Sequence, residues 1–180
     1  MKVLVTVGSR HGATLEIADE IGRRLREALT LLGELPEVDV RPAVFVAEVD
    51  EYHAVVLGSS VYHGRWVESA RELAEREHEA LVARPVWLFS SGACGSPPAV
   101  RLDGEELTRL RELTGAHQHR AFIGALDWRR LDPGELSEAS AVASSGGFGD
   151  YRNWPEFRHW ADTIATTLWA ATALDPHLVG

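Results

Sequence analysis

Cysteine is nearly absent from this sequence: Cys94 is the only one among 180 residues, so an intrachain disulfide is excluded. Long apolar runs are also absent, because the longest stretch, residues 164–174, is too short to span a bilayer and is interrupted by threonines. No secretory signal peptide precedes the first strand-like run, which begins at Lys2. We therefore expect a cytoplasmic protein without an integral membrane segment.

Positive charge is scarce as well. Eighteen Lys and Arg residues stand against 27 Asp and Glu residues, which gives a formal net charge of −9. Nucleic-acid phosphates require a basic surface, so binding to nucleic acid is not expected. An acidic surface suits electropositive protein partners, but it also simply keeps a protein soluble, and solubility is the simpler interpretation.

What the sequence does contain is a regular alternation of strand-like and helix-like segments. Continuous or alternating apolar patterns predict strands at residues 2–7, 38–41, 54–57, 85–89 and 120–126. Helical periodicity predicts helices at residues 15–32, 67–83, 104–113 and 154–173, with a further helical turn at 135–143. With 45% hydrophobic residues, this alternation predicts a single α/β domain, residues 1–180. Its core would be a doubly wound, five-stranded parallel sheet with helices on both faces.

The most informative stretch follows the first strand. An apolar run ends at Gly8, and small and hydroxyl residues then lead into a helix, whose first N–H groups have no intrahelical partner and attract a phosphate. Ser9 and Thr14 would add hydroxyl donors, Arg10 a positive charge, and Gly12 a backbone without a Cβ atom. The loop lacks the lysine of a nucleoside-triphosphate P-loop and is not a Gly-x-Gly-x-x-Gly dinucleotide fingerprint. Taken alone, it also fits an ordinary turn before a capped helix.

Two further loops rich in Gly and Ser follow the third and fourth strands, at residues 58–66 and 90–98. The carboxyl ends of parallel strands lie at one edge of the sheet, and ligands bind at that edge where the strand order reverses. Three permissive loops at the same edge therefore predict a ligand site more strongly than any one loop does.

Residues 7–14, 52–66, 89–92, 149–154 and 160–161, in this order and spacing, resemble the flavodoxin family. Within that family the sequence is similar to the branch that includes bacterial menaquinone-dependent protoporphyrinogen oxidases. The resemblance covers nearly the whole chain. It implies a flavodoxin-like sheet of order 2-1-3-4-5 and FMN as the cofactor, bound where the strand order reverses, as in flavodoxin itself.

The resemblance also implies where FMN lies. Residues 9–14 would hold its phosphate, residues 59–64 and 91–95 would flank its isoalloxazine ring, and Tyr62 is the aromatic residue best placed against the ring. No catalytic side chain and no metal ligand is assigned. The implied cofactor-binding residues are Ser9, Arg10, His11, Gly12, Ala13, Thr14, Ser59, Ser60, Val61, Tyr62, His63, Gly64, Ser91, Gly92, Ala93, Cys94 and Gly95.

Three of these residues have a simpler interpretation beside the functional one. His11 and His63 could hydrogen-bond the phosphate or the ring, or move a proton during reduction, but a loop histidine is more often just solvated. Cys94 could be a redox thiol, yet no basic residue lies near it in the sequence, so a small packed side chain is the simpler interpretation.

The function implied by the resemblance is FMN-dependent electron transfer or oxidoreduction. Reducing equivalents would pass to a redox partner protein, a quinone, or a small aromatic substrate such as a porphyrinogen. Arg10 matches the oxidase branch, whereas residues 127–149 are mostly small and polar where that branch carries a longer segment, and the substrate stays open. The alternative is a flavin-free binding or regulatory domain on the same fold.

Overall fold

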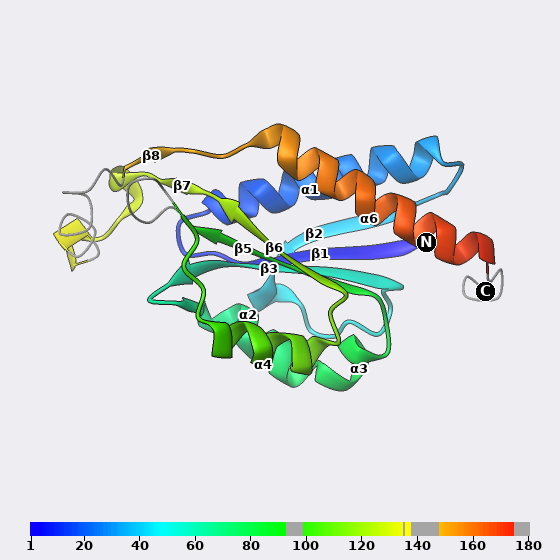
Figure 1. Cartoon of the computed structure of the whole chain (residues 1–180), viewed down its shortest axis with the longest axis horizontal. Helices are drawn as coiled ribbons and strands as arrows, with labels where there is room; N and C mark the ends of the chain where they lie inside the picture. The colour runs from blue at the N-terminus through cyan, green and yellow to red at the C-terminus, as the bar shows by residue number, and fades with distance from the viewer. Residues whose placement is uncertain (93–98, 135, 138–147, 175–180) are drawn as a thin grey trace.

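The computed structural model describes residues 1–92, 99–134, 136–137 and 148–174. Its middle layer is a parallel sheet with the strand order β2-β1-β3-β5-β6, which is the order 2-1-3-4-5 expected for five sequential strands (Figure 1). The doubly wound α/β fold is thereby confirmed. The strands are β1 (Lys2–Gly8), β2 (Glu37–Pro42), β3 (Ala54–Tyr62), β5 (Val86–Gly92) and β6 (Gln118–Ile123), and β4 (Arg65–Trp66) pairs antiparallel with the end of β3.

Helices cover both faces of the sheet. On one face lie α1 (Ala13–Leu31) and α6 (Trp154–Leu174), and on the other lie α2 (Glu68–Arg76), α3 (His78–Val82) and α4 (Gly104–Thr114) (Figure 1). The remaining short elements are η1 (Ala43–Phe45), β7 (Ala125–Leu126), η2 (Trp128–Arg130) and β8 (Gly149–Asp150). Within the described residues, no helix combines the length and the apolar character that crossing a membrane requires.

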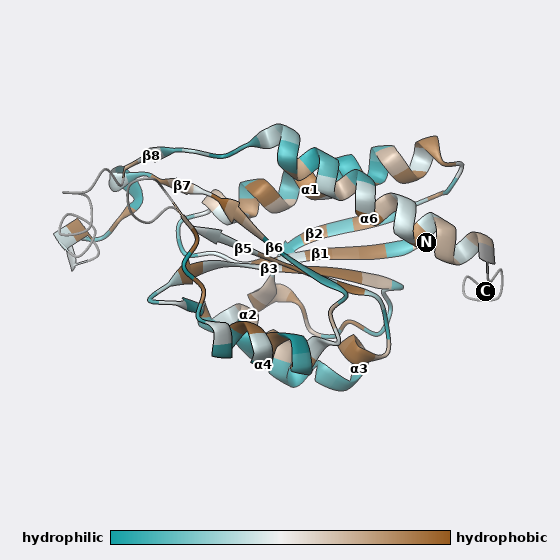
Figure 2. Cartoon of the chain, viewed as in Figure 1, coloured by the Kyte–Doolittle hydropathy of each residue, from teal (hydrophilic) through white to brown (hydrophobic). Residues whose placement is uncertain are grey.

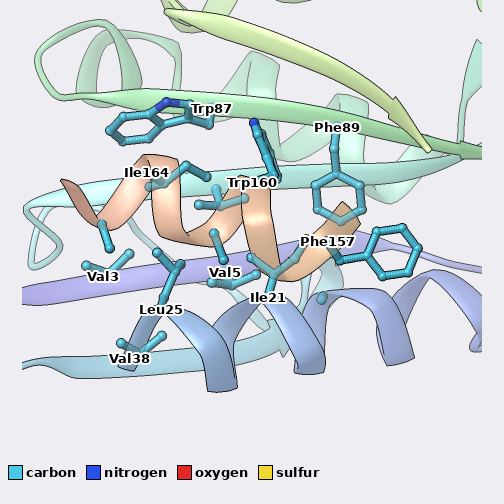
Figure 3. Packing of buried hydrophobic residues seen from close by; sticks show 14 of the residues in the cluster. Val3, Val5, Ile21, Leu25, Val38, Trp87, Phe89, Phe157, Trp160 and Ile164 are labelled. Carbon is cyan, nitrogen blue, oxygen red and sulfur yellow. The ribbon is translucent and has the colours of Figure 1, made fainter. Parts of the chain in front are cut away.

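The core consists of two apolar layers, one on each side of the sheet. Successive side chains of a strand point to opposite faces, so Val3 and Val5 of β1 pack toward α1 and α6 whereas Leu4 packs toward α2. Apolar residues accordingly fill the central strands, whereas the helices alternate apolar and polar residues along their length (Figure 2). On the α6 side, an aromatic group formed by Phe89, Phe122, Phe157 and Trp160 fills the space between helix and sheet (Figure 3).

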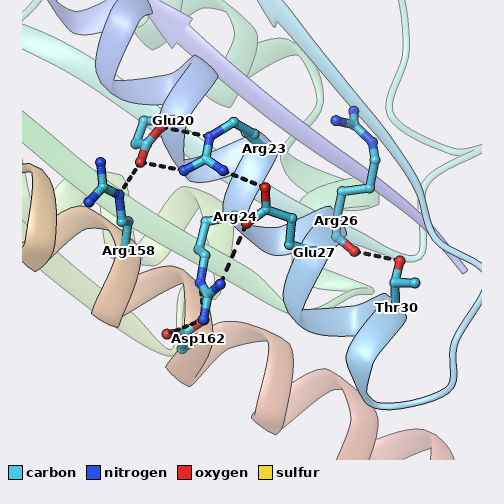
Figure 4. Close-up of polar contacts among 8 residues, drawn as sticks. All are labelled: Glu20, Arg23, Arg24, Arg26, Glu27, Thr30, Arg158 and Asp162. Atoms are coloured by element: carbon cyan, nitrogen blue, oxygen red, sulfur yellow. Dashed lines mark hydrogen bonds and ion pairs between the residues drawn. The ribbon is translucent and has the colours of Figure 1, made fainter.

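Ion pairs join the outer sides of α1 and α6. Arg24 contacts Asp162 at 2.7 Å, and Glu20 pairs with both Arg23 and Arg158 (Figure 4). Hydrogen bonding to Arg23, with Arg158 adding to it, lowers the pKa of Glu20 to about 2. Because water still reaches these pairs, each contributes little to stability, and their main effect is on how the two helices align.

The structure differs from the sequence prediction in several helices and strands, among them the second predicted helix and the fifth predicted strand. The helix predicted at residues 67–83 is divided at Glu77, whose φ and ψ of −100° and 16° are not helical and whose carboxylate accepts a hydrogen bond from the Val49 N–H. The strand predicted at 120–126 begins earlier and breaks at Gly124, where a Cβ atom would lie 2.5 Å from Ser91 Oγ. The turn predicted at 135–143 falls mostly outside the described residues.

A hydrogen-bonded chain of three side chains crosses the interior near α4. The Trp66 indole N–H donates to Ser90 Oγ at 2.7 Å, and Ser90 Oγ lies 2.8 Å from His119 Nε2. Since the Ser90 oxygen accepts from the indole, its proton is available to the ring, which therefore binds best in the neutral state with Nε2 unprotonated. Burial, with a smaller effect of Arg111, lowers the pKa of His119 to about 4.

This shift makes stability depend on pH. Unfolded histidine titrates near pH 6.5, so between about pH 6.5 and 4 only the unfolded chain takes up the proton, and folding is weakened as the pH falls. We expect His119 to account for about 1–2 kcal/mol of lost unfolding free energy between pH 7 and 4.5, allowing for partial solvent access. Urea unfolding of wild type and His119→Gln at both pH values measures it. Equal losses in the two proteins would contradict the assignment.

Candidate functional site

A cleft of about 1120 Å³ lies at the carboxyl ends of β1, β3 and β5, where the strand order reverses. Its walls come from the loop after β1, the end of β3, the end of β5, residues 99 and 101, and two later segments at residues 125–131 and 148–152. The cleft is therefore at the edge that the three Gly/Ser-rich stretches predict, and it also includes residues that the sequence does not single out.

The first wall is the loop and helix start at residues 9–14, which we call the first loop. Gly12 is the N-cap of α1, with φ of 82° and no side chain to cap the helix, so the N–H groups of the first turn keep no side-chain acceptor. Ser9 Oγ accepts the Gly12 N–H at 3.1 Å, which leaves the Ser9 proton available to an anion. Ser9, Arg10, His11, Ala13 and Thr14 all line the cleft.

The second wall is a β-hairpin, although the sequence predicts a loop there. β3 continues to Tyr62 and pairs with β4, and the two residues between them, His63 and Gly64, have φ of 49° and 78°. Two consecutive positive φ values are those of a type I′ turn, which matches the twist of the paired strands. The turn places Tyr62, His63 and Gly64 in the cleft wall, together with Ser60 and Val61.

Ser59 does not belong to the cleft, contrary to its assignment as a flavin contact. It is fully buried within β3, its Oγ accepts the Val67 N–H at 3.0 Å, and it donates to the Ser60 carbonyl at 2.8 Å. Both hydrogen-bonding roles of the hydroxyl are thus used inside the fold. Ser59 fixes the start of α2 rather than a ligand.

Tyr62 is in the expected place but is not bare. The guanidinium carbon of Arg10 lies 4.7 Å from the centroid of the Tyr62 ring, within the range of a cation–π contact, and the His11 ring lies 6.4 Å away at its edge. The first loop and the hairpin therefore meet through these three side chains. A flat ligand that stacks on the same face of Tyr62 has to displace Arg10 from it.

The third wall is the end of β5. Ser91 and Gly92 line the cleft as the last residues of this strand, and Gly92 O accepts the Gly124 N–H at 2.9 Å. Ala93, Cys94 and Gly95, which the sequence also assigns to the site, lie outside the described residues.

The largest addition to the sequence prediction is an arm made of β7, η2 and β8. β7 and β8 pair antiparallel and lie at the same end of the molecule as the start of α1 (Figure 1). Arg130 of the arm and Arg152, two residues after β8, converge on one carboxylate: Arg130 Nη1 and Arg152 Nη1 contact the two oxygens of Glu16 at 3.1 and 2.6 Å. Arg130 also donates to His11 O at 2.9 Å, so the arm is attached directly to the first loop.

This Glu16 clamp shapes the charge next to the first loop. Hydrogen bonding to Arg152 lowers the pKa of Glu16, with partial burial opposing the shift and Arg130 adding to it. The carboxylate is therefore negative at neutral pH. In the sequence, the only sign of this contact is the presence of Arg129–Arg130 after the fifth strand and of Arg152. Nothing in their spacing indicates an ion pair with residue 16.

The cleft is rich in positive charge although the whole chain carries −9. The arginines in its wall are Arg10, Arg101, Arg129, Arg130 and Arg152, against Asp127 and Asp150. Low-dielectric walls with an excess of one sign concentrate the field inside a cleft. The site therefore favours an anionic ligand.

Comparison with known proteins gives the site a family. A family model described as a flavodoxin domain matches residues 4–137, more than half of the chain. The chain belongs to the flavodoxin-domain family. Membership indicates FMN as the cofactor, and flavin-dependent electron transfer or oxidoreduction as the class of function.

Solved structures agree with this fold. A flavodoxin from the domain Archaea is 18% identical, with a TM-score of 0.55 and coverage of 93% of this chain and 99% of that chain. The flavodoxin of Streptococcus pneumonia TIGR4 is also 18% identical, with a TM-score of 0.54 and coverage of 95% and 99%. An oxidoreductase from Corynebacterium diphtheriae is 16% identical, with a TM-score of 0.59 and coverage of 94% and 96%. No curated protein sequence matches the chain.

The residues present fit FMN. The uncapped start of α1 suits a phosphate monoester. Gly12 has a positive φ, which residues with a side chain rarely adopt, whereas a Cβ atom at this position would lie 3.6 Å from Arg130 Nη1, an ordinary contact. Steric blocking by a Cβ atom, which the sequence suggested, is therefore a smaller constraint at Gly12 than the positive φ.

The Glu16 clamp can be tested by removing the carboxylate. We expect Glu16→Gln to cost about 1 kcal/mol of stability, because its ion pairs are partly exposed, and to raise hydrogen exchange in η2 and β8 several-fold by loosening the arm. Amide hydrogen exchange followed by mass spectrometry measures this loosening of η2 and β8. Glu75→Gln, which breaks the Glu75–Arg109 pair on the other face, is the control and should leave the arm unchanged. Equal exchange of the arm in wild type and Glu16→Gln would contradict the clamp.

Proposed function

We propose that this flavodoxin-family chain binds FMN with the phosphate on the first loop and the isoalloxazine ring between the β3–β4 turn and the end of β5. The observation that carries the proposal is the start of α1, where the N-cap Gly12 supplies no capping side chain and the neighbouring Ser9 and Thr14 line the cleft. When bound, FMN supplies the redox chemistry, and the protein supplies position and electrostatics.

The residues divide into two tasks. Around the phosphate, the N–H groups of Ala13 and Thr14 donate hydrogen bonds, and Ser9 Oγ and Thr14 Oγ1 add hydroxyl donors, while Arg10 contributes charge once it leaves the Tyr62 face. Around the ring, Tyr62 offers an aromatic surface, and the backbone of residues 63–64 and 91–92 offers polar groups to the ring edge.

We further propose that the flavin exchanges electrons with a redox partner protein, a quinone or a small aromatic substrate, as in a protoporphyrinogen oxidase-like enzyme. Two features of the site support a small-molecule reaction. The cleft is large, at about 1120 Å³, and Trp128 at its edge has 54% of its surface exposed.

The phosphate assignment is tested by comparing FMN with riboflavin, which lacks the phosphate. Thr14→Val keeps the shape of this buried residue and removes its hydroxyl, and Gly12→Val forces a β-branched residue into a positive φ. We expect Thr14→Val to weaken FMN binding about fivefold to tenfold, and Gly12→Val more, with little effect on riboflavin. Titrations followed by flavin fluorescence measure both affinities.

Thr30→Ala serves as the matched control, because Thr30 lies in the last turn of α1, at the opposite end of the helix from the first loop, and its hydroxyl donates to the Arg26 carbonyl. It should leave both affinities unchanged. Equal losses for FMN and riboflavin in Thr14→Val would place the phosphate elsewhere. A wild-type chain that binds neither flavin would favour a flavin-free binding or regulatory domain.

The oxidase-like role needs a separate assay. With FMN bound and oxygen excluded, we expect the chain to oxidise protoporphyrinogen when menaquinone is supplied as acceptor, with porphyrin formation followed by fluorescence. Formation at the rate of a protein-free control would reject this role and leave electron transfer to a protein partner as the proposal.

A further inference from the structure

The cleft extends beyond the residues that are assigned to FMN. Pockets that bury a single drug-sized ligand usually measure about 300–1,000 Å³. This cleft measures about 1120 Å³, and its wall extends from the first loop to the arm. The wall at residues 128–131, together with Arg101, has no assigned contact with FMN, so a second ligand can be assigned to it.

Two of the cleft arginines have no assigned task. Arg10 belongs to the first loop, and Arg130 and Arg152 are held by Glu16. Arg101 and Arg129 also line the cleft, yet in the part of the chain that the structure describes neither guanidinium makes a hydrogen bond or an ion pair. Guanidinium groups match carboxylates with two parallel hydrogen bonds, so these two arginines are suited to an anionic ligand.

The backbone around these arginines is well anchored. The Asp103 N–H, two residues after Arg101, donates to Gly64 O at 2.8 Å, which ties this segment to the β3–β4 turn. Arg129 lies in η2, which Asp127 caps by accepting the Arg129 N–H at 3.0 Å. The two guanidinium groups are therefore presented to one cleft by two different fixed segments.

An aromatic and apolar surface lies next to these charges. The Arg129 guanidinium carbon is 5.6 Å from the centroid of the Trp128 ring, and that ring is more than half exposed. Leu126, Leu131 and Phe148 add apolar surface to the same part of the wall. An exposed indole stacks flat rings, so the chemistry of this region fits a ligand that is planar, aromatic and negatively charged.

We propose that the cleft binds, beside FMN, a small planar aromatic carboxylate whose charge contacts Arg101 and Arg129 and whose ring lies against Trp128. This inference rests on the proposed function and specifies the class of small molecule that the flavin site serves. Of the cleft arginines, Arg10 would then serve the cofactor, and Arg101 and Arg129 would serve the second ligand.

The test compares 2-naphthoate with its neutral counterpart 2-naphthamide, titrated calorimetrically into the FMN-saturated protein. We expect wild type to bind the carboxylate at least about tenfold more tightly, because one charge-assisted pair commonly contributes a factor of this size. The double variant Arg101→Gln and Arg129→Gln should lose this preference to within about twofold and keep its FMN affinity. Arg120→Gln removes the same charge from an exposed residue outside the cleft and should keep the preference.

Three results would overturn the inference: equal binding of the two probes by wild type, an undiminished preference in the double variant, or release of FMN as 2-naphthoate binds. Failure of the proposed function gives a different result, namely no FMN binding by wild type. The same probe titrations on the flavin-free chain then still decide whether Arg101 and Arg129 bind the carboxylate.

Discussion

The start of α1 leaves backbone N–H groups without acceptors at the point where β1 ends in the middle of the sheet. Gly12 makes this possible, since its φ of 82° turns the chain into the helix without a capping side chain. The hairpin turn, the end of β5 and the arm are all arranged around this terminus. Ion pairs and hydrogen bonds then attach the arm to it, through Glu16 and the His11 carbonyl.

The fold could be predicted because its signals are local. Apolar strand runs and helical periodicity lie within single segments, and the chain order of the strands gives the parallel sheet. The ends of β3 and β5 were harder to predict, because Gly and Ser have low strand propensity. Pairing with the neighbouring strand fixes the strand conformation there. Gly58 pairs with Phe89, whose ring would lie 2.2 Å from a Cβ atom at residue 58, and Ser59 pairs with Ser90.

The cleft-lining residues of the first loop and of residues 60–64 could be selected from the sequence, since each group lies within a few consecutive residues, although the hairpin that holds the second group was not predicted. The arm could not be selected in this way. Glu16 and Arg152 are 136 positions apart, and neither residue has a neighbour that indicates the other. Ser59 was misplaced because a hydroxyl in a Gly/Ser-rich stretch gives no sign of whether it faces a ligand or the N–H of Val67.

The account depends most on the phosphate lying against the first turn of α1. Nitrogen-labelled protein titrated with FMN and, in parallel, with riboflavin tests this directly through the amide resonances of Gly12, Ala13 and Thr14. The account predicts that these amides shift strongly with FMN, as hydrogen bonds to a phosphate form, and little with riboflavin. Unchanged amide resonances at these three residues, while FMN binding shifts the resonances of other residues, would contradict this position of the phosphate.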